Sequence, residues 1–160
     1  MTTEQNILIY GYGNPGRQDD GLGIFLTEKV DNWIKEKNLK SIKVDCNYQL
    51  NIEDAAEIAD KDLVVFVDAS KEDINDFLFT EVKPSDKTEF SMHAVSPSYI
   101  FNLCNIIYNK APDTYLLHIK GYKWDFLKEM TEQAENNLTK AYDFLMNFIL
   151  NNEVFLKNNN

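Results

Sequence analysis

The sequence predicts an α/β protein, a three-layer α/β/α sandwich with a largely parallel, twisted sheet of about five strands. Two observations support this prediction. Short apolar runs typical of buried strands alternate along the chain with longer segments in which apolar residues recur at helical spacing. The run at 62–67 (DLVVFV) is apolar after its first residue and rich in β-branched side chains, as expected for a strand buried on both faces.

The first half of the chain contains three predicted strands and two predicted helices. The strands cover 6–10, 41–46 and 62–67, and the helices cover 21–37 and 52–59. The first strand ends at a glycine, and the first helix carries leucine, valine, tryptophan and isoleucine at helical spacing. Either Asp19 or Asp20 could cap that helix.

The second half continues the alternation. Polar and apolar residues alternate over 77–82, which predicts a strand with one wetter face. Ser96 followed by Pro97 predicts a helix start, with a helix to about 108, because serine caps helices and proline suits the first helical position. A further strand is predicted over 114–119, an amphipathic helix over 129–150 and a frayed tail over 158–160.

Composition and charge exclude several classes of partner for this single predicted domain, residues 1–160. The chain has a net charge of −10 at pH 7, so nucleic acid is not expected as a partner. No apolar run approaches the ~18 residues of a membrane-spanning helix, and no signal peptide is visible. Cys46 and Cys104 lie in apolar runs and are expected to be buried free thiols, which predicts a cytoplasmic location.

A glycine-rich turn, GYGNPGRQDDGLG at 11–23, follows the first predicted strand. Its first six residues match G-x-G-x-x-G, a pattern of dinucleotide-binding turns. In a phosphate-binding turn, however, the glycines lead directly into a helix whose amides receive the anion. Here four residues intervene, including Asp19 and Asp20, and Pro15 lacks an amide donor. We therefore favour a turn that presents carboxylates, with a dinucleotide-dependent small-molecule enzyme as an alternative.

The same turn resembles the G-x-G-N-x-x-x-x-D-D-G-x-G signature of the hydrogenase maturation proteases. Further segments are similar to segments of that family, in the same order, so that the resemblance covers almost the whole chain. They are YQLNIEDAAEIAD at 48–60, LVVFVDAS at 63–70, HAVSP at 93–97 and YLLHIKG at 115–121.

The resemblance implies a fold, a reaction and a set of site residues. Members of the family are α/β/α endopeptidases that remove the C-terminal extension of a nickel–iron hydrogenase large-subunit precursor. By position in the motifs, Asp20, Asp68 and His93 would be the catalytic residues and the ligands of nickel. The nickel is delivered by the substrate and is not expected as a permanent cofactor. The expected partner is the precursor, bound by a monomer, with neither nucleic acid nor membrane involved.

The three residue types suit this chemistry independently of the family. Each lies near the end of a predicted strand or the start of a predicted helix, and sites of α/β sheets form at the carboxyl ends of strands. Two carboxylates and an imidazole make an open site for a first-row metal. No G-x-S-x-G turn or Cys–His pair is present, which disfavours a covalent intermediate.

Simpler roles are open for several of these residues. Asp68 could cap a turn, and His93 could be an ordinary loop histidine. We interpret His118 as structural, because it lies inside a predicted strand. Arg17 could pair with the aspartates or bind a carboxylate of the substrate. A binding module that recognises a metalloprotein precursor without cutting it is the main alternative function.

Overall fold

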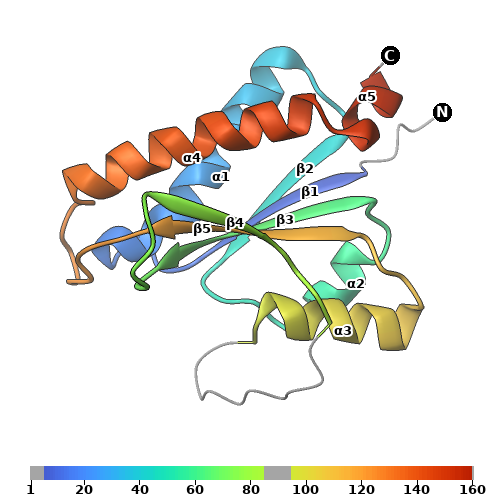
Figure 1. Cartoon of the computed structure of the whole chain (residues 1–160), viewed down its shortest axis with the longest axis horizontal. Helices are drawn as coiled ribbons and strands as arrows, with labels where there is room; N and C mark the ends of the chain where they lie inside the picture. The colour runs from blue at the N-terminus through green and yellow to red at the C-terminus, as the bar shows by residue number, and fades with distance from the viewer. Residues whose placement is uncertain (1–5, 85–94, 160) are drawn as a thin grey trace.

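The computed structural model describes residues 6–84 and 95–159. In this part of the chain a five-stranded sheet lies between two helical layers (Figure 1). Its strands are β1 (Ile7–Tyr12), β2 (Ile42–Asn47), β3 (Leu63–Ser70), β4 (Phe77–Glu81) and β5 (Asp113–Lys120). The order is β2-β1-β3-β5-β4, and all pairs are parallel except β4 with β5. The predicted α/β/α fold and largely parallel sheet are therefore confirmed.

The helices divide between the two faces of the sheet. The helical elements are η1 (Gln18–Gly21), α1 (Leu22–Lys37), α2 (Asp54–Ile58), α3 (Pro97–Tyr108), α4 (Glu132–Leu150) and α5 (Glu153–Asn159). Helices α1 and α4 cover one face, and α2 and α3 cover the other (Figure 1). Among the described residues, no helix combines the length and the apolar character that crossing a membrane requires.

Alternation along the central strands produces two separate cores. In β3, Val65 and Val67 belong to the core under α1 and α4, whereas Val64 and Phe66 belong to the core under α2 and α3. All five residues from Leu63 to Val67 are fully buried. The run is apolar throughout because helices cover both faces of this central parallel strand.

The helix starts follow capping chemistry. The Ser96 hydroxyl accepts a hydrogen bond from the Tyr99 amide, and Pro97 is the first residue of α3, as predicted. Helix α4 begins at Glu132, later than the predicted 129, because the Thr131 side chain caps it by accepting from the Ala134 amide.

Two expectations near the periphery are wrong. The predicted frayed tail is helical through Asn159, because α5 buries Phe155 and the Asn159 side-chain amide donates to Ser41 Oγ over 2.8 Å. Cys104 is a buried free thiol as expected, but Cys46 is exposed, because it lies near the end of the edge strand β2. Apolar neighbours in the sequence do not bury a residue at the open end of an edge strand.

Candidate functional site

The glycine-rich turn lies at the carboxyl end of β1, and the protein itself uses its amides. Amides that donate within the protein are those of Gly13, Asn14, Gly16, Arg17, Asp19 and Asp20. The Asn14 amide donates to Asp20 Oδ2 over 2.9 Å, the position that a phosphate oxygen would take in a nucleotide-binding turn. The structure therefore disfavours phosphate binding here and favours a turn that positions a carboxylate.

Close packing explains the glycines of this motif. A Cβ atom on Gly23, in the first turn of α1, would lie 2.5 Å from the Val67 carbonyl oxygen and 2.7 Å from that of Tyr12. A Cβ atom on Gly11 would lie 2.2 Å from the Gly23 carbonyl oxygen. The start of α1 can therefore approach β1 and β3 without side chains between them. This contact brings the residues just before α1, including Asp20, to the end of β3.

Asp19 is fully buried and serves the fold. Its carboxylate accepts hydrogen bonds from the amides of Tyr122 and Lys123, at 2.7 and 3.1 Å, and from the amide and hydroxyl of Thr131, both at 2.8 Å. These donors belong to the loop between β5 and α4. Both oxygens of Asp19 are therefore engaged, and its role is to attach that loop to the turn.

Asp20 and Asp68 both lie at the carboxyl ends of the strands and are half-buried, close enough for the charge of Asp20 to act on Asp68. Burial, together with the negative charge of Asp20, raises the pKa of Asp68 to about 7. Hydrogen bonds to the Asp68 carboxylate from the Tyr12 hydroxyl and the Ala69 amide act in the opposite direction. The structure thus brings together two of the three residues that the sequence nominated.

Tyr12 is part of this site, although the sequence reasoning missed it. Burial and the adjacent Asp68 carboxylate raise the pKa of the Tyr12 hydroxyl well above its usual value, so it remains a proton donor. Its position between two glycines gave no sign of this contact. In the sheet, Tyr12 and Asp68 lie on the face covered by α2 and α3, because even-numbered residues of β1 and β3 point to that side.

His93, the third nominated residue, lies outside the described residues. Val95, two residues later, packs against the core on the same face of the sheet as Asp68. Within 6–84 and 95–159, no group of three or more histidine, cysteine, aspartate or glutamate side chains could hold a metal ion. A three-ligand site that includes Asp20 and Asp68 would therefore need a ligand from outside these ranges or from a substrate.

His118 lies beside Asp68 in the sheet, since the two are register partners on β5 and β3. Its Nε2 lies 3.1 Å from the hydroxyl oxygen of Thr80 on β4, and burial lowers its pKa. The ring therefore connects β5 to the edge strand β4, in line with its interpretation as a structural residue.

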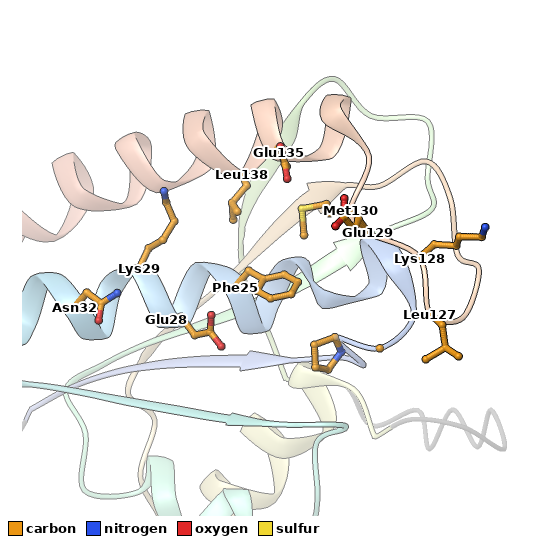
Figure 2. Close-up of a pocket in the computed structure, with 12 residues that line it drawn as sticks. Phe25, Glu28, Lys29, Asn32, Leu127, Lys128, Glu129, Met130, Glu135 and Leu138 are labelled. Carbon is orange, nitrogen blue, oxygen red and sulfur yellow. The ribbon is translucent and has the colours of Figure 1, made fainter.

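A cleft of about 730 Å³ lies on the other side of the turn, between α1 and the segment that leads into α4 (Figure 2). Phe25, Met130 and Leu138 project into it, with Glu28 and Lys29 along α1. Neither Asp20 nor Asp68 lines this cleft. It lies on the face covered by α1 and α4, so we do not assign the carboxylate chemistry to it.

The structure is similar to solved hydrogenase maturation proteases over nearly its whole length. One is the [NiFe] hydrogenase maturation protease HycI from Thermococcus kodakarensis KOD1, with a TM-score of 0.74, 20% identity and coverage of 92% of this chain and 94% of that chain. Another is the hydrogenase maturating endopeptidase HybD from E. coli, with a TM-score of 0.66, 14% identity and coverage of 91% and 92%.

A third is the endopeptidase HycI from Escherichia coli, with a TM-score of 0.65, 17% identity and coverage of 89% of this chain and 90% of that chain. No protein-family model matches the sequence, and no curated protein matches it either. At these identities the likeness shows the fold. The chain therefore has the fold of the hydrogenase maturation proteases, as its motifs led us to expect.

Proposed function

We propose that this protein is an endopeptidase that removes the C-terminal extension of a nickel–iron hydrogenase large-subunit precursor after metal insertion. The juxtaposition of Asp20 and Asp68 at the carboxyl ends of the strands is the observation that carries the proposal. Two further findings support it: the full-length likeness to solved maturation proteases, and a motif whose glycines are used for packing instead of phosphate binding.

In this proposal Asp20, Asp68 and His93 contact the nickel that the precursor carries. Two carboxylates and an imidazole suit a first-row metal ion and leave coordination positions for the substrate's own ligands. Asp20 is the better candidate than Asp19, because Asp19 is fully buried and both its oxygens accept hydrogen bonds from the β5–α4 loop. Asp20 accepts one hydrogen bond, at Oδ2, from the described residues.

The acid pair also suits a hydrolysis without a covalent intermediate. Once ionised, a carboxylate of this pair can take a proton from water and return it to a leaving amine. The two carboxylates repel each other in the free protein, so a cation carried by the substrate would favour their ionised forms. Recognition of a metal-loaded precursor would thereby be coupled to the chemistry.

The proposal places the protein in the cytoplasm, as a monomer acting on a protein substrate. Both cysteines are free, which suits a reducing compartment. The electrostatics agree with a protein partner, because a chain of net charge −10 repels nucleic acid.

Incubation with a nickel-loaded large-subunit precursor, followed by mass measurement of the precursor, tests the proposal. We expect the wild-type protein to remove a C-terminal peptide, and Asp20→Asn, Asp68→Asn and His93→Ala to remain folded but leave the precursor intact. Asp62→Asn is the matched control, because Asp62 is exposed just before β3, at the opposite end of that strand from Asp68. His118→Gln controls for the loss of a histidine.

Full processing by all three variants would remove the assignment of these residues. Binding of the precursor by the wild-type protein without any loss of mass would indicate the non-cleaving binding module instead. Tight binding of NAD or FAD in a titration would favour the dinucleotide-dependent enzyme, against the geometry of the turn.

A further inference from the structure

Two cations flank Trp124 beside the candidate site. Arg17 Nε donates a hydrogen bond to the Trp124 carbonyl oxygen over 3.0 Å, and its guanidinium carbon lies 5.6 Å from the centre of the Phe126 ring. The Lys71 ammonium nitrogen lies 4.9 Å from the centre of the Trp124 indole. Aromatic faces attract cations, so these contacts hold both side chains in place without neutralising their charge.

Neither cation forms an ion pair with a carboxylate of residues 6–84 or 95–159. The aspartates nearest to Arg17 in sequence have other partners, since Asp19 accepts from the β5–α4 loop and Asp20 from the Asn14 amide. The structure therefore does not show Arg17 pairing with these aspartates.

Hydrogen bonds from the turn hold the backbone on both sides of Trp124. Asp19 accepts hydrogen bonds from the amides on the N-terminal side of Trp124, at Tyr122 and Lys123. Gln18 Oε1 accepts from the Asp125 amide, on its C-terminal side, over 3.1 Å. Trp124 is thus attached to the turn on both sides, and the cations are positioned before any ligand arrives. Preorganisation of this kind lowers the entropic cost of binding.

Both cations lie next to the proposed catalytic residues in the chain. Arg17 precedes Asp20 by three residues, and Lys71 follows Asp68 by three. The Gly121 amide donates to the Ser70 carbonyl oxygen, which places the start of the β5–α4 loop against the end of β3. A peptide that reaches Asp20 and Asp68 would therefore pass close to Arg17 and Lys71.

We propose that Arg17 and Lys71, supported by Trp124, form a subsite that binds carboxylates of the peptide segment being cleaved. The inference rests on the proposed function of the adjacent site. With Nε engaged, the Nη groups of Arg17 can bind a carboxylate, and Lys71 adds a point charge nearby. The carboxylate could come from an acidic side chain or from the end of the chain, so the test separates these sources.

Binding of short peptides, measured by the fluorescence of Trp124 in a Trp33→Phe background, tests the subsite without requiring proteolysis. Three alanine-rich peptides are compared: one with two adjacent glutamates and an amidated C-terminus, its amidated glutamine counterpart, and the glutamine peptide with a free C-terminal carboxylate. We expect the glutamate peptide to bind about tenfold more tightly than the amidated glutamine peptide. The difference in affinity should shrink at high salt. Preferential binding of the free-carboxylate peptide alone would assign the subsite to the chain end.

The variants are Arg17→Met and Lys71→Met, which keep most of the side-chain length, and Arg17→Lys, which keeps the charge but loses the planar fork. We expect both methionine variants to lose the preference for carboxylates and Arg17→Lys to retain part of it. Lys123→Met is the control, because Lys123 is an exposed cation of the same loop. Circular dichroism checks that each variant is folded.

Equal affinity of the wild-type protein for all three peptides, or an undiminished preference in both methionine variants, would overturn the subsite. In the processing assay the same variants should raise KM about tenfold and leave kcat within about twofold, as expected for lost uniform binding. A wild-type protein that binds the glutamate peptide but cleaves no precursor would retain the subsite and reject the endopeptidase, so the two proposals fail separately.

Discussion

Asp19 and Asp20 are adjacent in the sequence, but their surroundings differ. Asp19 is fully buried and its carboxylate accepts hydrogen bonds from the β5–α4 loop, whereas Asp20 is half-buried and lies close enough to Asp68 for its charge to raise the pKa of that carboxyl. Capping alone, the simplest role for this pair in the sequence, describes neither residue, because no side-chain hydrogen bond caps η1 or α1. Asp19 attaches the β5–α4 loop, and Asp20 lies near Asp68 at the end of β3.

Ionisation of Asp68 should make the fold less stable as the pH rises. The folded pKa of about 7 lies above the ordinary value of 3.8, so between these values the folded state holds a proton that the unfolded chain has lost. The contribution of Asp68 should therefore lower the free energy of unfolding as the pH rises from about 4 to about 7. Asp68→Asn cannot ionise, and we expect it to be about 1–2 kcal/mol more stable than the wild type at pH 8.

Urea unfolding at pH 5 and pH 8 checks this prediction. Asp62→Asn, at the other end of β3, should keep the pH dependence of the wild-type protein. If Asp68→Asn and the wild type show the same difference in stability between the two pH values, Asp68 is not the carboxyl that is held neutral. A gain in stability on removal of a carboxylate would show that the fold tolerates an unfavourable charge at this position.

At the scale of elements, the β5–α4 loop is organised by the turn that follows β1. Side chains of the turn hydrogen-bond the loop backbone: Arg17 donates to it, whereas Gln18 and Asp19 accept from it. In addition, the Leu127 amide donates to the Gly16 carbonyl oxygen. Leu127 has a φ of 57° and is 94% exposed, a conformation and an exposure that are unfavourable for leucine. These hydrogen bonds account for the persistence of that conformation.

Asp19→Asn should release this loop. An asparagine places an amide group where a carboxylate oxygen now accepts, so at least one backbone donor of the loop would face another donor. We expect a loss of about 2–4 kcal/mol in the free energy of unfolding, together with faster amide hydrogen exchange over 121–131. Asp125→Asn, an exposed change in the same loop, should have little effect on either measurement.

Stability and exchange are measured together here because they distinguish two roles. Loss of stability with an unchanged exchange pattern in the loop would mean that Asp19 supports the core without holding the loop. Retention of wild-type stability would contradict the structural role altogether and would reopen Asp19 as a ligand.

At the scale of the whole molecule, the two ends of the parallel strands have separate roles. The candidate site and the β5–α4 loop lie at the carboxyl ends of the strands, whereas α5 lies at the opposite end (Figure 1). There the Asn159 side chain contacts Ser41 just before β2, and Phe155 packs into the core under α4. This helix should therefore affect stability without affecting catalysis.

Phe155→Ala should lower the free energy of unfolding by about 2–4 kcal/mol, because it removes a side chain that is only 8% exposed. Leu156→Ala on the same helix is the matched control, since Leu156 is 42% exposed and its loss should cost little. Urea unfolding measures both, and processing by each variant under folding conditions should equal that of the wild type. Impaired processing by folded Phe155→Ala would contradict the view that α5 serves stability and not catalysis.

Local chemistry made much of the fold predictable. The 62–67 run required two covered faces, Ser96 and Pro97 required a helix start, and both expectations hold in the structure. The tail was misjudged because its few apolar residues offer no periodic stripe of useful length, and only contact with α4 and Ser41 orders α5. Burial of Cys46 was misjudged for a related reason, since the position of a strand within a sheet is not encoded by the strand itself.

By itself, the sequence determined the alternation of strands and helices, the covered central strand and the presence of acidic residues where sites of α/β sheets form. Those features depend on propensity and periodicity, which act over a few residues. Only the tertiary structure decided that Asp19 is buried in hydrogen bonds to the β5–α4 loop and that Asp20 lies near Asp68. It also decided that Tyr12 and the cations around Trp124 lie at the same end of the strands. Those outcomes depend on hydrogen bonds and packing between residues up to 112 positions apart, which no local pattern specifies.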